Sequence, residues 1–246
     1  MNRIEDYEVL KNRIVSWIKD YAESNGIKSL VVGVSGGIDS AVTSTLAAET
    51  GLMTYCIGMP LLQKEDQESL SDIHLDWLGD TYWDTKTEKF DLSNLFEVFR
   101  YTMRGYGKDN LALANSRSRL RMVTLYQVAQ KVGGIVVGTG NKVEDYGIGF
   151  YTKYGDGGVD IAPIADLYKS EVWELGRHLG INERIINAKP TDGLWDDGRN
   201  DDDQIGASYA DLEEAMEYRT GPALGILDKF SKQNRHKMEP IPTFKL

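Results

Sequence analysis

The sequence predicts an α/β fold in which a doubly wound parallel β-sheet carries helices on both faces. Short apolar runs, of which 30–34 and 134–138 are the clearest, alternate with segments whose apolar residues recur at helical spacing. These runs are continuously apolar, as is typical of parallel strands that are covered on both faces. A chain of 246 residues is long enough to bury one full core, so we expect a single domain over 1–246.

The apolar pattern of the first half of the chain predicts alternating helices and strands. In order, it predicts a helix over 4–21, a strand over 30–34, a helix over 39–49, a strand over 53–59, a helix over 67–78 and a short strand over 81–85. Asn25-Gly26 is a typical end for the first helix.

The second half of the chain adds the elements that complete the sheet and its covering layers. In order, it predicts helices over 91–105 and 110–132, a strand over 134–138, a glycine-rich loop to 160, a helix over 166–179, an acidic loop over 192–203 and a last helix leading into a basic tail at 235–237. Ser208 and Asp211 resemble a capping box that opens a further helix. Ligands of such sheets bind beyond the carboxyl ends of the strands, where the loops after 34 and 138 lie.

Composition and charge limit the partners and the compartment. A formal net charge of −10 is a poor electrostatic match to tRNA or DNA, so we expect no nucleic-acid partner. No run is long and apolar enough to span a bilayer, and the first residues lack the pattern of a secretory signal. The single cysteine, Cys56, lies in an apolar run and is expected in the core. These features predict a cytoplasmic protein without a membrane partner.

A loop rich in glycine and serine follows the first predicted strand and opens the next helix. It reads Ser35-Gly36-Gly37-Ile38-Asp39-Ser40. Glycines let the backbone approach a ligand, and the free amides at a helix start bind anions. Asp39 adds an oxygen ligand for magnesium beside a phosphate. Because the string Gly-x-x-x-x-Gly-Lys-Ser/Thr of a Walker A loop does not occur in the chain, we expect a phosphate site of another type.

This hexapeptide, placed between a buried strand and a helix, resembles the signature loop of the N-type ATP pyrophosphatases. The resemblance implies that the loop holds the pyrophosphate that leaves when a substrate oxygen attacks the α-phosphorus of ATP. It therefore implies adenylation of a small acid, with AMP and pyrophosphate as the products of ATP. The loop alone does not identify the acid.

The loop after the strand at 134–138 is more specific. It contains Thr139, Glu144, Lys153 and Asp160 in a glycine-rich segment, and long loops of this kind at the ligand edge of a sheet are usually functional. Together with the strings at 166–175, 190–195, 204–209 and 236–237, it resembles the ammonia-dependent NAD synthetases over nearly the whole chain.

The resemblance implies a set of ligand contacts. For ATP it implies Gly33, Val34, Ser35, Gly36, Gly37, Ile38, Asp39, Ser40, Thr139, Lys169 and Thr191. For deamido-NAD it implies Arg119, Lys153, Asp160, His236 and Lys237. The implied catalytic residues are Asp39, Lys153 and Lys169, and the implied ligands of the cofactor Mg²⁺ are Asp39 and Glu144. The chain departs from the family pattern by one additional residue between Glu144 and Lys153, so Asp145 is an alternative metal ligand.

Several of these residues also have ordinary structural explanations. Arg119 could form a surface ion pair on its helix, and Lys153 and Lys169 could be solvated lysines. The His236-Lys237 pair could belong to a disordered tail. The acidic residues at 196–197 and 201–203 are expected in a solvated loop, with a second metal site as the alternative.

The resemblance implies ATP-dependent amidation of deamido-NAD through an acyl-adenylate, by a homodimer. Free ammonia is the expected nitrogen source, because glutamine hydrolysis needs an activated nucleophile and Cys56 is expected to be buried and unreactive. Two other functions remain open. One is an adenylating enzyme of the same fold that acts on tRNA or another acid, and the other is a nucleotide-binding module without catalysis.

Overall fold

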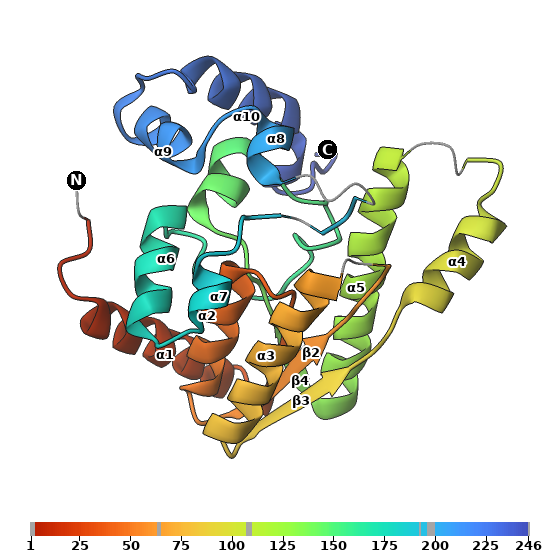
Figure 1. Ribbon diagram of the computed structural model, residues 1–246, viewed down its shortest axis with the longest axis vertical. Coiled ribbons are helices and arrows are strands. Elements are labelled where there is room, and N and C mark those ends of the chain that lie inside the picture. The colour runs from red at the N-terminus through yellow and green to blue at the C-terminus, as the bar shows by residue number, and fades with distance from the viewer. Residues whose placement is uncertain (1–2, 63–64, 107–109, 192, 196–199, 246) are drawn as a thin grey trace.

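The central feature of the molecule is a parallel β-sheet (Figure 1). The computed structural model describes residues 3–62, 65–106, 110–191, 193–195 and 200–245. The strands are β1 (Ser29–Val34), β2 (Met53–Gly58), β3 (Thr85–Lys89) and β4 (Gly134–Val137), in the order β3-β2-β1-β4. In register, Val32 of β1 lies beside Cys56 of β2 and Val137 of β4. The predicted fold class is therefore confirmed.

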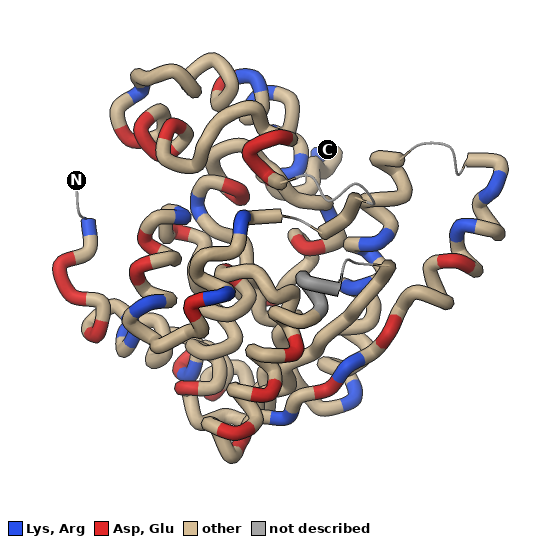
Figure 2. The backbone as a smooth tube through the Cα atoms, viewed as in Figure 1, with Lys and Arg blue, Asp and Glu red and all other residues tan. Residues whose placement is uncertain are grey.

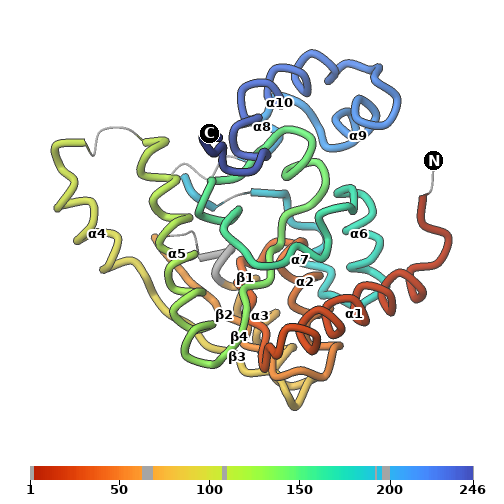
Figure 3. The backbone as a smooth tube through the Cα atoms, turned by 180° about the vertical axis from the view of Figure 1, so that it is seen from behind, coloured from red at the N-terminus to blue at the C-terminus, as the bar shows by residue number. Residues whose placement is uncertain are grey.

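Helices cover both faces of the sheet, as Figures 1 and 3 show from opposite sides. They are α1 (Tyr7–Ser24), α2 (Ile38–Ala48), α3 (Glu65–Thr81), α4 (Ser93–Thr102), α5 (Asn110–Val132), α6 (Lys169–His178), α7 (Glu183–Ile186), α8 (Asp201–Ile205), α9 (Tyr209–Tyr218) and α10 (Leu224–Met238). Leu30 and Val32 pack in one core with α1, α2 and α6, whereas Val31 points to the other face and packs with α4 and α5.

A separate layer of helices lies beyond the carboxyl end of β4. A π-helix, η1 (Val143–Ile148), follows β4, and helices α8, α9 and α10 pack around it in a smaller core. Leu212 of α9 and Ile148 of η1 are fully buried there. This layer stands over the same edge of the sheet as the loop between β1 and α2 (Figure 1), and because β1 and β4 are parallel neighbours, both predicted ligand loops leave the sheet at that edge.

The structure corrects several predicted elements. The strand predicted at 81–85 is wrong: α3 continues to Thr81, and β3 occupies Thr85–Lys89. The error arose because the apolar residues Tyr82 and Trp83 lie in the turn, whereas the edge strand itself is polar. The glycine-rich loop to 160 contains η1, which no period in the sequence predicts.

The C-terminal end of the chain is also more ordered than predicted. The basic residues 235–237 form the last turn of α10 rather than a tail, and a helix C-terminus favours such cations. Part of the predicted acidic loop, residue 192 and residues 196–199, lies outside the described residues. Asp201, predicted in a solvated loop, is buried at the start of α8 because it meets the hydroxyl of Tyr209. Ser208 caps α9 as predicted, accepting the amide of Asp211.

Candidate active site

The loop between β1 and α2 presents backbone amides to the open edge of the sheet. Gly36 has a φ of 89°, a conformation that side chains rarely adopt, so glycine is needed there. Gly37 caps α2 without a side-chain hydrogen bond, which leaves amides of the first helical turn available to an anion. The Ser35 and Ser40 hydroxyls lie 3.0 Å apart, and Ser40 also donates to the Gly37 carbonyl at 2.9 Å. The loop is thus internally braced around its amides.

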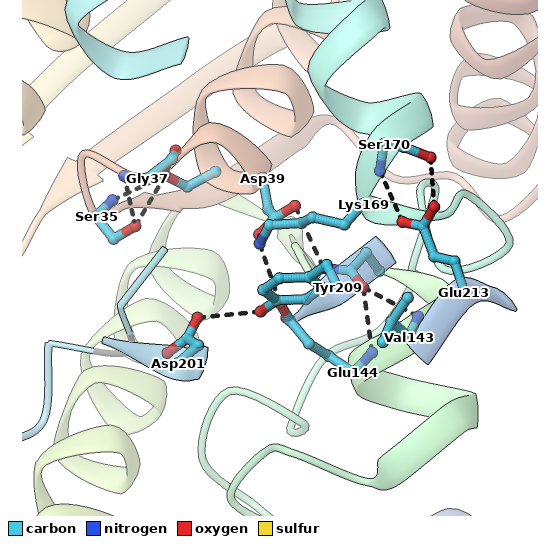
Figure 4. A network of polar contacts seen from close by, with 12 residues as sticks. Ser35, Gly37, Asp39, Val143, Glu144, Lys169, Ser170, Asp201, Tyr209 and Glu213 are labelled. Carbon is cyan, nitrogen blue, oxygen red and sulfur yellow. Dashed lines mark hydrogen bonds and ion pairs between the residues drawn. The ribbon is translucent and has the colours of Figure 1, made fainter. Parts of the chain in front are cut away.

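Lys169 is the centre of the candidate site (Figure 4). Its ammonium donates to Asp39 Oδ2 at 2.5 Å and to Glu144 Oε1 at 3.0 Å, and only 3% of its side chain is exposed. Burial disfavours the charged form of Lys169, but the two carboxylates outweigh it and raise the pKa of the ammonium above its ordinary value. The alternative that Lys169 is a solvated surface lysine is therefore wrong.

Asp39 is the carboxylate contributed by the β1–α2 side. It lies in the first turn of α2, and Asn141 Nδ2 lies 3.4 Å from its second oxygen. Burial raises the pKa of Asp39 above its ordinary value, Lys169 opposes that shift, and the nearby Glu144 charge adds to it. Asp39 and Glu144 repel each other and share the single positive charge of Lys169. A further cation would therefore stabilise this site.

Lys169 is the first residue of α6, and contacts from distant segments of the chain hold this first turn in place. Arg3, near the N-terminus, donates to both carboxylate oxygens of Glu171, at 2.9 and 2.7 Å. Glu213 of α9 accepts from the amide and the hydroxyl of Ser170, at 2.9 and 2.6 Å. The first turn of α6 is therefore fixed both by the N-terminal segment and by the C-terminal layer.

In the π-helix η1, the side chains of the two candidate metal ligands, Glu144 and Asp145, point in different directions. Asn141 Oδ1 accepts the amides of Val143 and Glu144, which fixes the start of η1. Glu144 points to Lys169, whereas the Asp145 carboxylate lies against Gly140, where a β-carbon would come within 2.3 Å of it. A π-turn accommodates one additional residue within a helix. The Glu144 carboxylate therefore meets Lys169 beside Asp39, and the Asp145 carboxylate lies against Gly140 instead.

The geometry around Asp39 and Glu144 fits a magnesium ion that is also bound by phosphate. Among the described residues, no group of three His, Cys, Asp or Glu side chains gathers to hold a metal alone. Magnesium usually takes one or two carboxylates together with substrate phosphates and water. Asp39 and Glu144 meet at Lys169, and Asp39 lies two residues after the Gly37 cap at the start of α2. The two residues therefore suit this type of metal site.

The residues predicted to contact deamido-NAD come from three segments that the fold brings together. Arg119 of α5 reaches the Lys153 carbonyl from two nitrogens at 3.3 Å each. Lys153 Nζ donates to the His236 carbonyl at 2.8 Å, and Lys237 Nζ donates to the Tyr151 carbonyl at 2.7 Å. The end of α10 is thus docked on the loop at 151–153. The disordered-tail alternative for His236 and Lys237 is wrong.

The other predicted contacts lie around this group. Asp160 accepts the Val136 amide at 2.8 Å and the Tyr126 hydroxyl at 3.1 Å, so it also fastens the loop to β4. Thr139 is partly buried just after β4, and Thr191 accepts the amide of Gly193 at 3.2 Å. A cavity of about 170 Å³ opens after β4. Its lining includes Gly138, Gly140, Asp145, Tyr151, Asp156 and Met238.

The sequence did not point to two residues of the site, Tyr209 and Asp201. The Tyr209 hydroxyl lies 2.6 Å from Glu144 Oε1 and 3.1 Å from Asp201 Oδ2. Burial, and then the charges of these two carboxylates, raise the pKa of Tyr209, so the hydroxyl keeps its proton and donates it. Tyr209 belongs to the string at 204–209, which carried the family resemblance, but nothing in its local sequence indicated a contact with Glu144.

These features define a class: an α/β protein of the adenine nucleotide α-hydrolase-like fold, with a glycine-rich loop after β1 that lacks the Walker lysine. The chain belongs to the NAD synthase family, whose sequence model matches residues 10–238. It is 40% identical over 263 aligned residues to the NH₃-dependent NAD⁺ synthetase of Methanosarcina mazei. This alignment covers 96% of this chain and 98% of that protein.

Two solved structures extend the comparison. The NMN synthetase of Francisella tularensis is 29% identical and superposes with a TM-score of 0.91, covering 99% of this chain and 100% of that one. The NH₃-dependent NAD synthetase of Campylobacter jejuni is 22% identical with a TM-score of 0.77, covering 98% of this chain and 100% of that one. The second likeness supports the fold alone.

Proposed function

We propose that this protein catalyses the ATP-dependent amidation of deamido-NAD by free ammonia, the last step in making NAD. The acceptor carboxylate attacks the α-phosphorus of ATP, giving an acyl-adenylate and pyrophosphate. Ammonia then attacks the acyl carbon, the C–O bond to AMP breaks, and a proton is lost to leave the amide. The observation that carries this proposal is the meeting of Asp39, Glu144 and Lys169 beside the phosphate loop, in a chain of the NAD synthase family.

The residues of the site divide the work of the first step. The amides of Gly36 and Ile38 and the Ser35 hydroxyl would bind the phosphates, with Gly33, Val34, Thr139 and Thr191 around the nucleotide. Asp39 and Glu144 would hold Mg²⁺, which neutralises phosphate charge when it is bound. Lys169 keeps its positive charge at the same place and orients both carboxylates. The protein mainly contributes positioning and charge stabilisation.

Arg119, Lys153, Asp160, His236 and Lys237 would bind the acceptor. The cations among them converge on the loop at 151–153, where carbonyl oxygens now accept their hydrogen bonds. Phosphate oxygens of a dinucleotide would be stronger acceptors than these carbonyls. Asp160 is held by the Val136 amide, so its carboxylate is fixed in place for a polar ligand group.

Free ammonia is the nitrogen source in this proposal. Cys56 is fully buried, and burial raises the pKa of its thiol to about 12, so it cannot serve as a nucleophile for glutamine. A Cys56→Ala variant should keep its activity with ammonium. Sustained product formation from glutamine in purified wild type, and its loss in Cys56→Ala, would contradict this source.

A second candidate acceptor is the mononucleotide, nicotinic acid mononucleotide, with NMN as the product. The observation that favours it is the full-length likeness, with a TM-score of 0.91, to a protein described as an NMN synthetase. The chemistry and the ATP site would be the same, and only the acceptor would differ. The deciding experiment is to offer equal amounts of both acids with ATP, Mg²⁺ and ammonium, and to identify the amides by mass. Predominant NAD supports the main proposal, and predominant NMN supports the second.

The proposed assembly is a homodimer that works in the cytoplasm. Helix α4 stands beside α5 at the outer side of the molecule (Figures 1 and 3). Its Leu95, Val98 and Tyr101 are at least half exposed. A second copy would cover this apolar surface. Acidic and basic residues are interspersed over the backbone in Figure 2, and the net charge of −10 disfavours a nucleic-acid partner. No helix among the described residues has the length and apolar character to cross a membrane. Sedimentation of wild type and Val98→Asp would test the dimer.

A further inference from the structure

Tyr209 connects the C-terminal layer to the proposed metal ligand Glu144. It is the first residue of α9 and is only 4% exposed, with its ring edge-on to Trp173. Its hydroxyl has one proton to donate and lies closer to Glu144 Oε1, at 2.6 Å, than to Asp201 Oδ2, at 3.1 Å. Glu144 is therefore its main acceptor (Figure 4).

The contacts to Glu144 fix the orientation of its carboxylate. Lys169 Nζ and the Tyr209 hydroxyl both donate to the same oxygen, Oε1, and the Lys169 ammonium also lies 4.8 Å from the centre of the Tyr209 ring. Within the described part of the chain, these are the side-chain donors to Glu144, so its second oxygen is left for an incoming cation. A carboxylate held at one oxygen by two donors loses little further freedom when the other oxygen binds a metal.

The surroundings of Tyr209 carry more negative than positive charge. The carboxylates of Asp39, Glu144 and Asp201 all act on the single ammonium of Lys169. Without the Tyr209 hydroxyl, Glu144 would lose one of its two side-chain donors and would depend on Lys169, which it shares with Asp39. Repulsion would then turn Glu144 away from Asp39 or draw a proton or a water molecule into the gap.

We propose that Tyr209 is a positioning residue that holds Glu144 in its metal-binding orientation. Tyr209 would touch neither ATP nor the acceptor and would act through Glu144 alone. This inference rests on the proposed function, because it assumes that Glu144 binds Mg²⁺ beside ATP.

The test is a Mg²⁺ titration of nucleotide binding in Tyr209→Phe. The full-length protein is titrated calorimetrically with α,β-methylene-ATP at increasing Mg²⁺ and without acceptor, so no turnover contributes. We expect the Mg²⁺ concentration for half-maximal binding to rise about tenfold, as is typical when a residue that orients a metal ligand is removed. Nucleotide affinity at saturating Mg²⁺ and the melting temperature should stay near those of wild type, because phenylalanine keeps the ring.

Tyr82→Phe is the matched control. Its hydroxyl also donates to a carboxylate, Glu49 Oε1 at 2.7 Å, but this pair joins the end of α2 to the turn before β3, away from Lys169. This variant loses the same kind of hydrogen bond, so its Mg²⁺ titration should match that of wild type. A shift equal to that of Tyr209→Phe would overturn the inference.

A double-mutant cycle shows whether Tyr209 acts through Glu144. In a Glu144→Gln background, adding Tyr209→Phe should not weaken Mg²⁺ binding further, because the group that it positions is already lost. Independent, additive effects would overturn the inference. So would an unchanged Mg²⁺ titration in Tyr209→Phe, or a variant that does not fold, since a hydroxyl needed only for positioning is not needed for folding. If wild type shows no Mg²⁺-dependent nucleotide binding, the proposed function itself is contradicted.

Discussion

The β1–α2 loop and the C-terminal layer approach Lys169 from different directions, and they are built in different ways. The loop is short in sequence and is braced by its own hydroxyls, such as the Ser35–Ser40 contact at 3.0 Å. The C-terminal layer reaches the site through side chains distant in sequence, such as Tyr209 to Glu144 at 2.6 Å. The loop is therefore built by local contacts, whereas the position of Glu144 depends on how a second core packs.

The largest expected effect comes from the shared carboxylates. Asp39→Asn keeps the shape of the side chain but removes a charge from the proposed metal site, so activity should fall by orders of magnitude while the fold survives. Asp166→Asn is the matched control, because Asp166 also pairs with a lysine, Lys142 at 2.9 Å, but its side chain is 85% exposed. Steady-state rates and thermal melts of both variants make the comparison. Full activity in Asp39→Asn would remove Asp39 from the site.

A pair of core variants separates the two regions. Leu46 of α2 and Leu212 of α9 are both fully buried, in the sheet core and in the C-terminal core respectively. Each leucine-to-alanine change should cost about 2–5 kcal/mol of unfolding free energy. Leu212→Ala should also weaken Mg²⁺-dependent ATP binding, because Leu212 lies one turn after Tyr209 on α9. Denaturant unfolding and nucleotide titration measure the two effects. Equal nucleotide affinity in the two variants would show that the C-terminal core does not set the metal site.

The pH dependence of stability probes the sheet side alone. His74 of α3 is buried beside Ser44 and Trp77, and burial lowers its pKa from 6.5 to about 4. Between these two values, His74 binds a proton in the unfolded chain but not in the folded chain. The free energy of unfolding therefore decreases as pH falls from 6.5 towards 4. The loss should approach about 3 kcal/mol. His74→Gln cannot titrate, and urea unfolding at pH 7 and pH 4.5 should show a smaller loss than in wild type. Equal losses would mean that His74 is protonated in the fold.

The smallest effect concerns acceptor recognition. Arg119→Ala should raise KM for the acceptor about tenfold and leave KM for ATP nearly unchanged, because a hydrogen bond to a charged group contributes about 1.5–3 kcal/mol. Arg177→Ala is the control, since Arg177 pairs on the surface with Glu174 of the same helix. Kinetics with each substrate varied in turn measure the difference. An equal change in both constants, or none, would return Arg119 to a structural role.

The parts of the molecule that the sequence predicted are those with local causes. The apolar runs predicted β1, β2 and β4, and the glycines and serines at 35–40 predicted the loop between β1 and α2. Phosphate binding by this loop stays a prediction. These features depend on neighbours a few residues apart, so periodicity and backbone chemistry are enough to find them.

The parts that escaped prediction depend on contacts across the chain. Nothing near Asp201 indicates that it is buried, because its partner Tyr209 lies on the next helix and both turn inward only when α9 packs on η1. Likewise, Arg3 fixes Glu171 from 168 residues away. The π-helix has no sequence period of its own, so periodicity could not find it.

The central claim is that this site cleaves ATP between its α- and β-phosphates to activate an acid. The most direct measurement uses ATP labelled at the α-phosphorus, in a single turnover with Mg²⁺, ammonium and deamido-NAD, followed by separation of the nucleotides. The account predicts that all the label released from ATP appears in AMP, with one pyrophosphate for each amide formed. Label in ADP, accompanied by orthophosphate, would contradict it.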